Sequence, residues 1–448
     1  MMFRRFRVLI LFLAVLLVPF AAAESEGEFD YKLLDDGNVM LTGYNGSGRD
    51  IAFPETIDGY TVYGLSGTFG ANTASIANIR SITIPNTLTE IEPGAFRFAQ
   101  YLTEIHIADD HPVLSFADGV LYSRKDRSLL HYLQTNTAEH FDVPDGIIEI
   151  ADKAFVRAGL HSVSIPGSVE RIGSESFYQC SRLKKIALSE GLKTIGADTF
   201  TNCDMLREIE IPASVTDIAE SVFTDAHLKE IRVAQDSAVF AVSGGALINT
   251  REGVLIAFPP FSEAESCVIP EGVTRIARFA FYRCHNLKQV VFPKTLREIG
   301  QGAFLMCNHL TGIDLPDGIT RLEERAFGIN SDSEQLHLPG GLTEIVNNFD
   351  DLAISELKIP ETVKVIEKSF TSLPKLTEVV IPHSVTTIGS GSFVFCRNLA
   401  SITIPASVTD IRSTFIGCTG NLVFRVEPGS FAEQYCREHK LEFEYISE

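Results

Sequence analysis

The chain has 448 residues, of which 45% are hydrophobic, so it is longer than one ordinary globular domain and has ample apolar material for a core. It carries 38 Lys and Arg against 58 Asp and Glu, a formal net charge of −20. Such an acidic surface repels nucleic acid and anionic membranes, which excludes both as expected partners.

The first 23 residues predict a secretory signal peptide. A start with three arginines precedes an apolar run over 8–20 and three alanines at 21–23. We expect cleavage after Ala23, which makes the protein secreted or exposed at a cell surface. The alternative is an uncleaved anchor, but the uncharged run over 8–23 has 16 residues and contains Pro19, whereas a span needs about 20.

Removal of residues 1–23 leaves 35 basic and 58 acidic side chains, a net charge of −23. No later segment is apolar enough to cross a membrane, so we expect no integral membrane segment after cleavage. The strong negative charge predicts a preference for basic partners and weaker binding at high salt. The oligomeric state is left open.

From 54 to 426 the chain repeats one unit, in most cases every 21 to 23 residues. The line LTEVVIPHSVTTIGSGSFVFCRN (376–398) is followed at once by LASITIPASVTDIRSTFIGCTG, and both match L-x-x-I-x-I-P-x-x-V-x-x-I-x-x-x-x-F-x-x-C. A unit this short cannot bury its own apolar face, so successive units must stack and share one core. About sixteen such rungs predict a β-rich repeat solenoid, α+β in broad class, with a parallel sheet on one face.

Each unit predicts a short strand, a second extended segment and an aromatic column. In the unit at 376–398, Val379 and Ile381 flank Val380, so we expect the first two to face the core and Val380 to face solvent. The proline that follows ends strand pairing, because it has no N–H to donate. The phenylalanine ten or eleven residues after the proline should close the far side of the solenoid. Members of this column include Phe177, Phe200, Phe281, Phe304, Phe393 and Phe415.

These repeats resemble the BspA-like, or Treponema-type, leucine-rich repeat of bacterial and some protozoan surface and secreted proteins. The resemblance implies a hairpin cap at 24–53, where Asp36-Gly37 is a natural tight turn, and a closing helix and strand at 427–448, where Ser430 and Glu433 form a capping box. It also implies inserted β-hairpins near 109–135 and 235–261, where the repeat interval lengthens to 36 residues. We expect these insertions to project from one side as candidate contact elements.

Six of the eight cysteines occupy one column of the template. They could form disulfides between adjacent rungs, hold a metal or simply pack. Ala99, Ala158 and Ala226 take the same place in other units, which favours a small buried side chain. A bridge would need distortion, because stacked side chains keep their Cβ atoms too far apart, and no C-x-x-C pair or nearby histidine completes a zinc site. The column consists of Cys180, Cys203, Cys284, Cys307, Cys396 and Cys418.

Four polar residues on outward strand positions form the first candidate site. Stacking of units predicts that His106 lies beside Asp142 and that Glu104 lies beside His140. Two imidazoles and two carboxylates on one face could bind a metal or a polar ligand, and would make the protein a metal-dependent binder or enzyme. We favour the alternative, a pair of solvated cross-strand charge contacts. No metal or cofactor is therefore expected.

The second candidate site is apolar. Val268 and Val291 should lie side by side on the outward face, near Phe258 and Phe261 of the second insertion. Exposed aromatic and aliphatic side chains together can mark a partner surface. We expect Phe258 to pack its hairpin onto the solenoid and Phe261, after Pro259 and Pro260, to contact a partner.

The sequence contains no H-E-x-x-H, G-x-S-x-G, P-loop or dinucleotide-binding glycine pattern, so an enzyme is not expected. The leading hypothesis is a secreted or cell-surface leucine-rich-repeat protein that binds a protein or other macromolecule. The resemblance implies recognition of, or adhesion to, host, cell or matrix components. The alternative is a structural or self-assembling envelope component.

Overall fold

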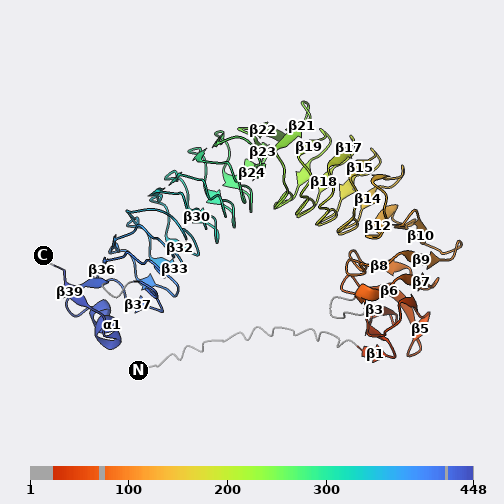
Figure 1. Ribbon diagram of the computed structural model, residues 1–448, viewed down its shortest axis with the longest axis horizontal. Helices are drawn as coiled ribbons and strands as arrows, with labels where there is room; N and C mark the ends of the chain where they lie inside the picture. The colour runs from red at the N-terminus through yellow and green to blue at the C-terminus, as the bar shows by residue number, and fades with distance from the viewer. Residues whose placement is uncertain (1–23, 70–75, 419–421, 447–448) are drawn as a thin grey trace, which may run out of the picture.

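The computed structural model describes residues 24–69, 76–418 and 422–446, and the predicted signal peptide at 1–23 lies outside them. The described chain forms a β-solenoid bent into an arc, with the first and last units at its two ends (Figure 1). The predicted fold class, a β-rich repeat solenoid with a cap at each end and two insertions, is confirmed.

Two ladders of parallel strands follow the arc. The strands of the first ladder contain the I-x-I segment of the repeat and have three or four residues each. They are β4 (Asp50–Ala52), β7 (Ser81–Ile84), β9 (Glu104–Ile107), β13 (His140–Asp142), β15 (Ser162–Ile165), β17 (Lys185–Leu188), β19 (Glu208–Ile211), β21 (Glu230–Val233), β25 (Ser266–Val268), β27 (Gln289–Val291), β29 (Gly312–Asp314), β31 (Gln335–His337), β34 (Glu378–Val380), β36 (Ser401–Ile404), β38 (Val423–Val426) and β39 (Phe443–Tyr445).

The second ladder contains the second apolar segment of each unit, and most of its strands have two residues. They are β6 (Tyr60–Leu65), β8 (Glu90–Ile91), β12 (Ser128–Tyr132), β14 (Glu149–Ile150), β16 (Arg171–Ile172), β18 (Thr194–Ile195), β20 (Asp217–Ile218), β24 (Val254–Ala257), β26 (Arg275–Ile276), β28 (Glu298–Ile299), β30 (Arg321–Leu322), β32 (Glu344–Val346), β33 (Val365–Glu367), β35 (Thr387–Ile388) and β37 (Asp410–Ile411).

The alternation of apolar and polar residues decides which side chains enter the core. Val379 and Ile381 are buried, whereas Val380 between them is 56% exposed, as the period of two predicts. In the second ladder Ile150 is in register with Ile172 of the next rung, and both are buried. Because the template repeats, a buried position of one rung packs against the same position of the next, as Ile195 does against Ile218.

The predicted aromatic column is confirmed as a stack of rings through the core. Phe304 and Phe327, for example, have ring centroids 4.9 Å apart and an angle of 2° between the ring planes. One run of rings extends from Tyr132 to Phe223 and a second from Phe258 to Phe415. Stacked aromatic pairs contribute beyond their buried area, so this column ties successive rungs together.

The two ladders differ in continuity, and this difference matches the bend of the solenoid. Within the described chain the second ladder has long hydrogen-bonded runs, such as β12-β14-β16-β18-β20, while much of the first ladder is divided into pairs and triplets. In Figure 1 the labels of β14, β18 and β30 lie toward the inner edge of the arc, and those of β15, β17 and β21 toward its outer edge. Strands on the longer outer edge cannot all keep the spacing of about 4.8 Å that hydrogen bonding requires, so that ladder separates.

Each insertion forms a three-stranded antiparallel sheet whose last strand joins the second ladder. The first comprises β10 (Leu114–Ala117), β11 (Val120–Ser123) and β12; the second comprises β22 (Phe240–Ser243), β23 (Ala246–Asn249) and β24. All residues of β23 and β24 are buried. The expectation that the insertions project from one side is therefore wrong for these strands, because their apolar residues are part of the core.

Both ends of the solenoid are covered. At the N-terminal end β1 (Glu24–Glu26), β2 (Phe29–Leu33) and β3 (Val39–Tyr44) form an antiparallel sheet that continues into β6, with β5 (Thr56–Ile57) beside it and the 3-10 helix η1 (Ile76–Asn78) following. At the C-terminal end lie α1 (Phe431–His439) and β39.

The predicted capping box begins α1. The Ser430 side chain accepts a hydrogen bond from the Glu433 amide, and the Glu433 carboxylate accepts one from the Gly429 amide. The first bond satisfies an amide that the first helical turn leaves without a partner, and the second holds the Glu433 side chain against the residue before the cap, so both stabilise the start of the closing helix. The predicted tight turn at Asp36-Gly37 lies between β2 and β3, where Gly37 has a φ of 80°.

The buried apolar side chains form two clusters that meet at the first insertion. Leu121 and Leu133 belong to the N-terminal cluster, whereas Val120 and Tyr132 belong to the longer cluster that extends to the C-terminal cap. His131 is buried at this meeting point, with its ring centroid 5.6 Å from that of Phe96. Its Nε2 atom has no hydrogen-bond partner within the described chain. An uncompensated imidazole in this place should be neutral in the folded protein.

Burial lowers the pKa of His131 from 6.5 to about 4, which makes stability depend on pH. Below pH 6.5 the unfolded chain binds a proton at His131 that the folded chain does not, so the free energy of unfolding should fall as the pH drops toward 4. We expect a loss of about 3 kcal/mol from this residue. Chemical denaturation of the wild type and of His131→Phe between pH 7 and 4 measures it. A difference between the two proteins that stays constant over this range would contradict the assignment.

Candidate functional site

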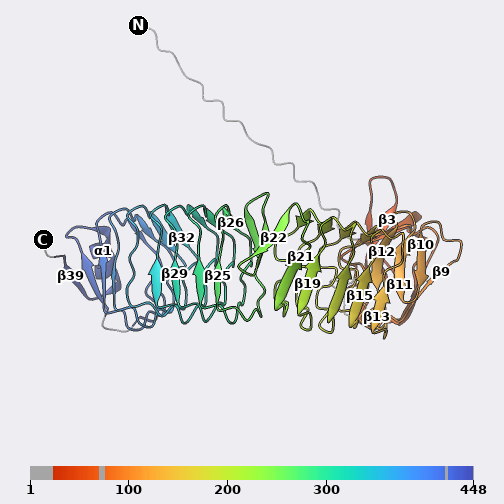
Figure 2. The same ribbon diagram turned by 90° about the horizontal axis from the view of Figure 1, so that it is seen from above.

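The outward side chains of the first ladder form exposed columns along the arc. Every second residue of a strand points away from the core, so each unit contributes one or two side chains to this surface. Figure 2 shows strands β13, β15, β19, β21, β25 and β29 following one another along the molecule. The solenoid therefore presents side chains from many rungs on one rigid, extended face.

An uncharged patch lies on β25 and β27, and we call it the valine patch: Ser266, Val268, Gln289 and Val291. The two strands pair in parallel with Val268 opposite Val291, as predicted. Val268 is 58% exposed and Val291 is 45% exposed. Adjacent exposed aliphatic side chains on a sheet are costly to leave in water and are favourable contacts for another protein.

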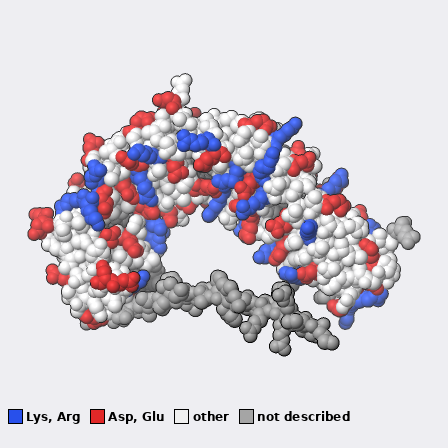
Figure 3. All heavy atoms as spheres, turned by 180° about the vertical axis from the view of Figure 1, so that it is seen from behind, with Lys and Arg blue, Asp and Glu red and all other residues white. Residues whose placement is uncertain are grey.

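Charged residues occupy the corresponding positions on β19 and β21. Glu208 and Glu230 are in register, as are Glu210 and Arg232. The Arg232 guanidinium lies 2.9 Å from Glu208 and 2.5 Å from Glu230. Its contact with Glu230 lowers the pKa of that carboxyl group. On the face of the molecule shown in Figure 3, acidic and basic side chains are interspersed over the arc.

The predicted cluster of Glu104, His106, His140 and Asp142 does not form. His106 pairs with Glu104 on β9 at 3.4 Å, and His140 pairs with Asp142 on β13 at 2.8 Å. β9 and β13 belong to separate hydrogen-bonded groups, because the first insertion interrupts the ladder between them. The prediction that His106 lies beside Asp142 is wrong, since the stacking rule does not hold across a 36-residue interval.

The two histidine pairs are exposed contacts between residues two positions apart in one strand. The Asp142 carboxylate accepts hydrogen bonds that lower its pKa, from Ser164 first and then from His140. Among the residues that the structure describes, no group of three or more His, Cys, Asp or Glu side chains could hold a metal ion. In the same residues no helix has the length and apolar character of a membrane span.

Phe258 and Phe261 occupy different environments at the end of the second insertion. Phe258 is buried and stacks on Phe281 at 5.3 Å, so the expectation that it packs the insertion onto the solenoid is confirmed. Phe261 is half-buried, with its ring centroid 4.2 Å from that of His227 and 4.8 Å from that of His285. This position gives Phe261 a structural role between rungs, and a contact with a partner stays a prediction.

All eight cysteines are free thiols, as the packing interpretation predicts. Members of the column donate a hydrogen bond from the thiol to the backbone carbonyl of a phenylalanine in the preceding unit. Cys180 Sγ lies 3.0 Å from the oxygen of Phe155, and Cys307 Sγ lies 2.9 Å from the oxygen of Phe281. A small donor that reaches this carbonyl explains why cysteine recurs where alanine is also accepted.

Burial makes these thiols unreactive. It raises the pKa of Cys180, Cys267 and Cys396 to about 12 and that of Cys436 to about 11. The pKa values of Cys203 and Cys284 are also raised, first by burial and then by the neighbouring cysteine. The thiolate is the reactive and metal-binding form, so these raised pKa values favour a packing role for these cysteines.

A groove between β17 and β19 was not predicted from the sequence. It has a volume of about 490 Å³, and its lining includes Lys185, Ala187, Glu208, Glu210 and Arg232. β17 ends one hydrogen-bonded group of the first ladder and β19 begins the next, so the two strands are not bonded to each other. The small side chain of Ala187 in an outward column is the one sequence signal of this depression.

The chain matches a family model described as the BspA type leucine rich repeat region, in six copies, over residues 68–122, 131–243, 257–370 and 346–421. Its structure is similar to the crystal structure of the pneumococcal vaccine antigen PcpA, with 19% identity, a TM-score of 0.52, and coverage of 96% of this chain and 99% of that chain. It is also similar to a leucine-rich repeat protein from Eubacterium ventriosum, with 19% identity, a TM-score of 0.55, and coverage of 88% and 93%. No curated protein matches the chain. At these identities the two structures support the fold alone.

Thiol counting tests the packing role of the cysteine column. In the folded protein we expect a thiol reagent to modify at most Cys418, which is the one cysteine that is not fully buried. After denaturation without a reductant all eight thiols should react. A bridge between Cys180 and Cys203, found as two missing thiols and a disulfide-linked peptide, would overturn the interpretation.

Proposed function

The chain belongs to the BspA-type leucine-rich repeat family, and we propose that it is a secreted or cell-surface protein that recognises another protein through the outward face of its first ladder. Leucine-rich repeat arrays stack short units into extended surfaces that suit such recognition. The fold alone does not choose a function, so the proposal depends on the residues of this face.

The valine patch is the observation that carries the proposal. Val268 and Val291 are exposed and adjacent on β25 and β27, and their outward neighbours Ser266 and Gln289 carry no charge. Earlier along the same ladder, before the second insertion, the strands β19 and β21 present Glu208, Glu210, Glu230 and Arg232. An uncharged centre beside charged surroundings is the usual composition of a protein interface, in which apolar contacts supply affinity and charges supply orientation.

The charge of the chain indicates the kind of partner. With a net charge of −20 over the whole sequence, the protein should attract basic proteins and bind them more weakly as salt increases. The exposed pairs Glu104–His106 and His140–Asp142 add to the polar part of the same face. We propose that they modulate binding electrostatically rather than hold a metal.

Secretion and adhesion complete the proposal. The basic, apolar and small-residue segments within 1–23 support export with cleavage after Ala23. A rigid array exposed outside the cell could attach to host, cell or matrix proteins over many weak contacts. This binding role requires no catalytic group, cofactor or metal.

Affinity measurements with matched variants test the proposal. Candidate partners are captured on the immobilised 24–448 chain from extracellular and matrix proteins, identified by mass spectrometry, and each is then purified for a direct Kd measurement. Val268→Asp/Val291→Asp should weaken binding at least tenfold, because it places charge in the apolar centre of the interface. Val380→Asp is the control, since Val380 is 56% exposed on β34 outside the patch.

We expect the control variant to change Kd by less than threefold. Circular dichroism should show that all variants keep the wild-type fold, because the three valines are exposed. The proposal is wrong if no purified partner binds, or if the double variant and Val380→Asp bind as the wild type does.

A further inference from the structure

The solenoid is interrupted at the second insertion in both ladders. In the second ladder β20 ends one hydrogen-bonded run and β24 begins the next, while in the first ladder β21 and β25 belong to different groups. The aromatic stack stops at Phe223 and resumes at Phe258. Among the described residues, a single backbone hydrogen bond joins residues 206–233 to residues 254–286, from the amide of Phe261 to the oxygen of Leu228 at 2.9 Å.

The reason is a shortened turn in the inserted unit. Phe281 follows Ile276 by five positions in an ordinary unit, whereas Phe258 follows Leu255 by three positions. In the uninterrupted part, turn amides donate to the carbonyls of the next unit; for example, the amide of Phe200 lies 2.9 Å from the oxygen of Val222. The shorter turn does not present the matching carbonyls to the unit before it.

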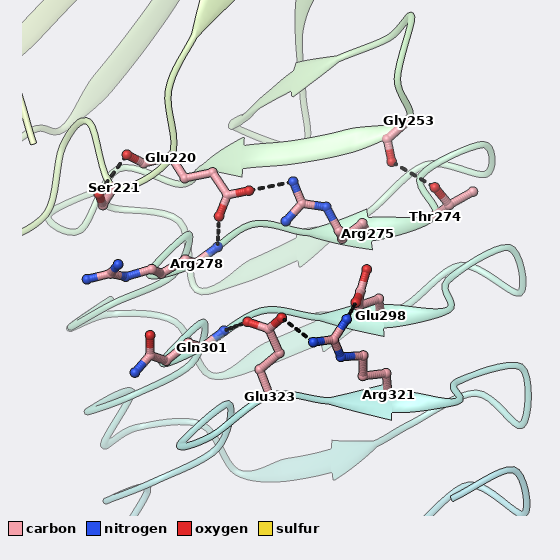
Figure 4. Close-up of polar contacts among 10 residues, drawn as sticks. All are labelled: Glu220, Ser221, Gly253, Thr274, Arg275, Arg278, Glu298, Gln301, Arg321 and Glu323. Carbon is pink, nitrogen blue, oxygen red and sulfur yellow. Dashed lines mark hydrogen bonds and ion pairs between the residues drawn. The ribbon is translucent and has the colours of Figure 1, made fainter. Parts of the chain in front are cut away.

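Two carboxylates span this interruption, as Figure 4 shows for the first of them. Glu220 forms an ion pair with Arg275 and accepts a hydrogen bond of 3.0 Å from the backbone amide of Arg278. Asp225 lies 2.8 Å from the guanidinium of Arg283. We call Glu220, Asp225 and the arginines Arg275 and Arg283 the clasp. Its two pairs join residues 55 and 58 positions apart in the chain.

The electrostatic balance keeps the clasp charged. Burial alone would raise the pKa of Glu220, but the hydrogen bonds from Arg275 and from the Arg278 amide lower it overall. For Arg283 the hydrogen bond with Asp225 raises the pKa further. Half-buried ion pairs with additional hydrogen bonds are worth more than fully exposed ones, so the clasp can hold two segments that lack a shared ladder.

We infer that the second insertion is a bending point of the solenoid and that the clasp sets the angle between the segments on its two sides. Both ladders and the aromatic stack are discontinuous at this point, so the clasp and the hydrogen bond from the Phe261 amide to the Leu228 oxygen connect the two segments. Phe261 between His227 and His285, and the 2.9 Å pair of Lys229 with Glu263, add secondary contacts across the same place.

The bend separates two parts of the outward face. The charged strands β19 and β21 precede the interruption, and β25 and β27 with the valine patch follow it. The clasp therefore sets how these two parts are presented together to a partner. This consequence rests on the proposed function, whereas the bend itself is tested without any partner.

A matched pair of carboxylates within a continuous ladder provides the control. Glu298 and Glu323 both contact Arg321, and Glu323 accepts a hydrogen bond of 2.9 Å from the amide of Gln301 (Figure 4). β26, β28 and β30 are hydrogen-bonded to one another in this region. Glu298→Gln/Glu323→Gln removes two carboxylates, as Glu220→Gln/Asp225→Asn does, so the change in net charge is the same.

Hydrogen exchange and small-angle X-ray scattering of the 24–448 chain distinguish the two variants. In Glu220→Gln/Asp225→Asn we expect amide exchange to rise at least tenfold over 221–227 and 275–285, and the scattering curve to depart from that of the wild type as the arc changes its bend. In the control variant, exchange should rise only near 298–325, and scattering should match the wild type.

Equal scattering from the wild type and the clasp variant, with faster exchange confined to the Arg278 amide, would overturn the inference. If the clasp variant does not fold, as judged by circular dichroism, Arg275→Gln/Arg283→Gln is measured in its place, because it leaves Glu220 able to accept the Arg278 amide. The same change in scattering is expected from it. A wild-type curve from that variant would equally overturn the inference.

Discussion

No unit of this solenoid can bury its apolar residues alone, and the rest of the structure depends on that constraint. Each strand has a few residues, and within each aromatic run a phenylalanine is covered by the rings of the units before and after it, as for Phe177 between Phe155 and Phe200. Stability is therefore shared between neighbours and accumulates along the array. A residue is accepted at a column position only if it packs against the residues at that position in the neighbouring units.

The same constraint divides the positions of each unit into fixed and variable ones. Inward positions repeat because they must match the next unit, while outward positions such as Val268 and Glu210 are free to differ from unit to unit. Recognition can change on the outward face without disturbing the core. The bend of the array also shapes the outward face. Strands of the first ladder separate along the longer outer edge, which opens a groove such as that between β17 and β19.

The sequence predicts what the repeat itself determines. The spacing of the phenylalanines led to the aromatic stack, the alternation of cysteine and alanine led to buried thiols, and the register of adjacent units placed Val268 beside Val291. The prediction from the sequence failed where the repeat is interrupted. His106 and Asp142 occupy the same position of successive units, but an insertion separates their strands. The template also gave no sign that Phe261 lies between His227 and His285, which come from units before and after the insertion.

Features that arise from curvature could not be predicted from the template. The groove over Ala187 and the clasp formed by Glu220 and Asp225 depend on how far apart neighbouring units lie, and a repeat pattern contains no such distance. Contacts between residues 55 or more positions apart also have no signal in the spacing of one unit. These features required the three-dimensional arrangement of the arc.

A double-mutant cycle on the aromatic column tests most directly whether neighbouring units stabilise one another. Phe304→Leu and Phe327→Leu remove rings that stack at 4.9 Å, whereas Phe304→Leu and Phe393→Leu remove rings that are not in contact. Free energies of unfolding from chemical denaturation should give a coupling of about 0.5–1.5 kcal/mol for the adjacent pair and a value near zero for the distant pair. Equal coupling for both pairs, or none for the adjacent pair, would contradict the account.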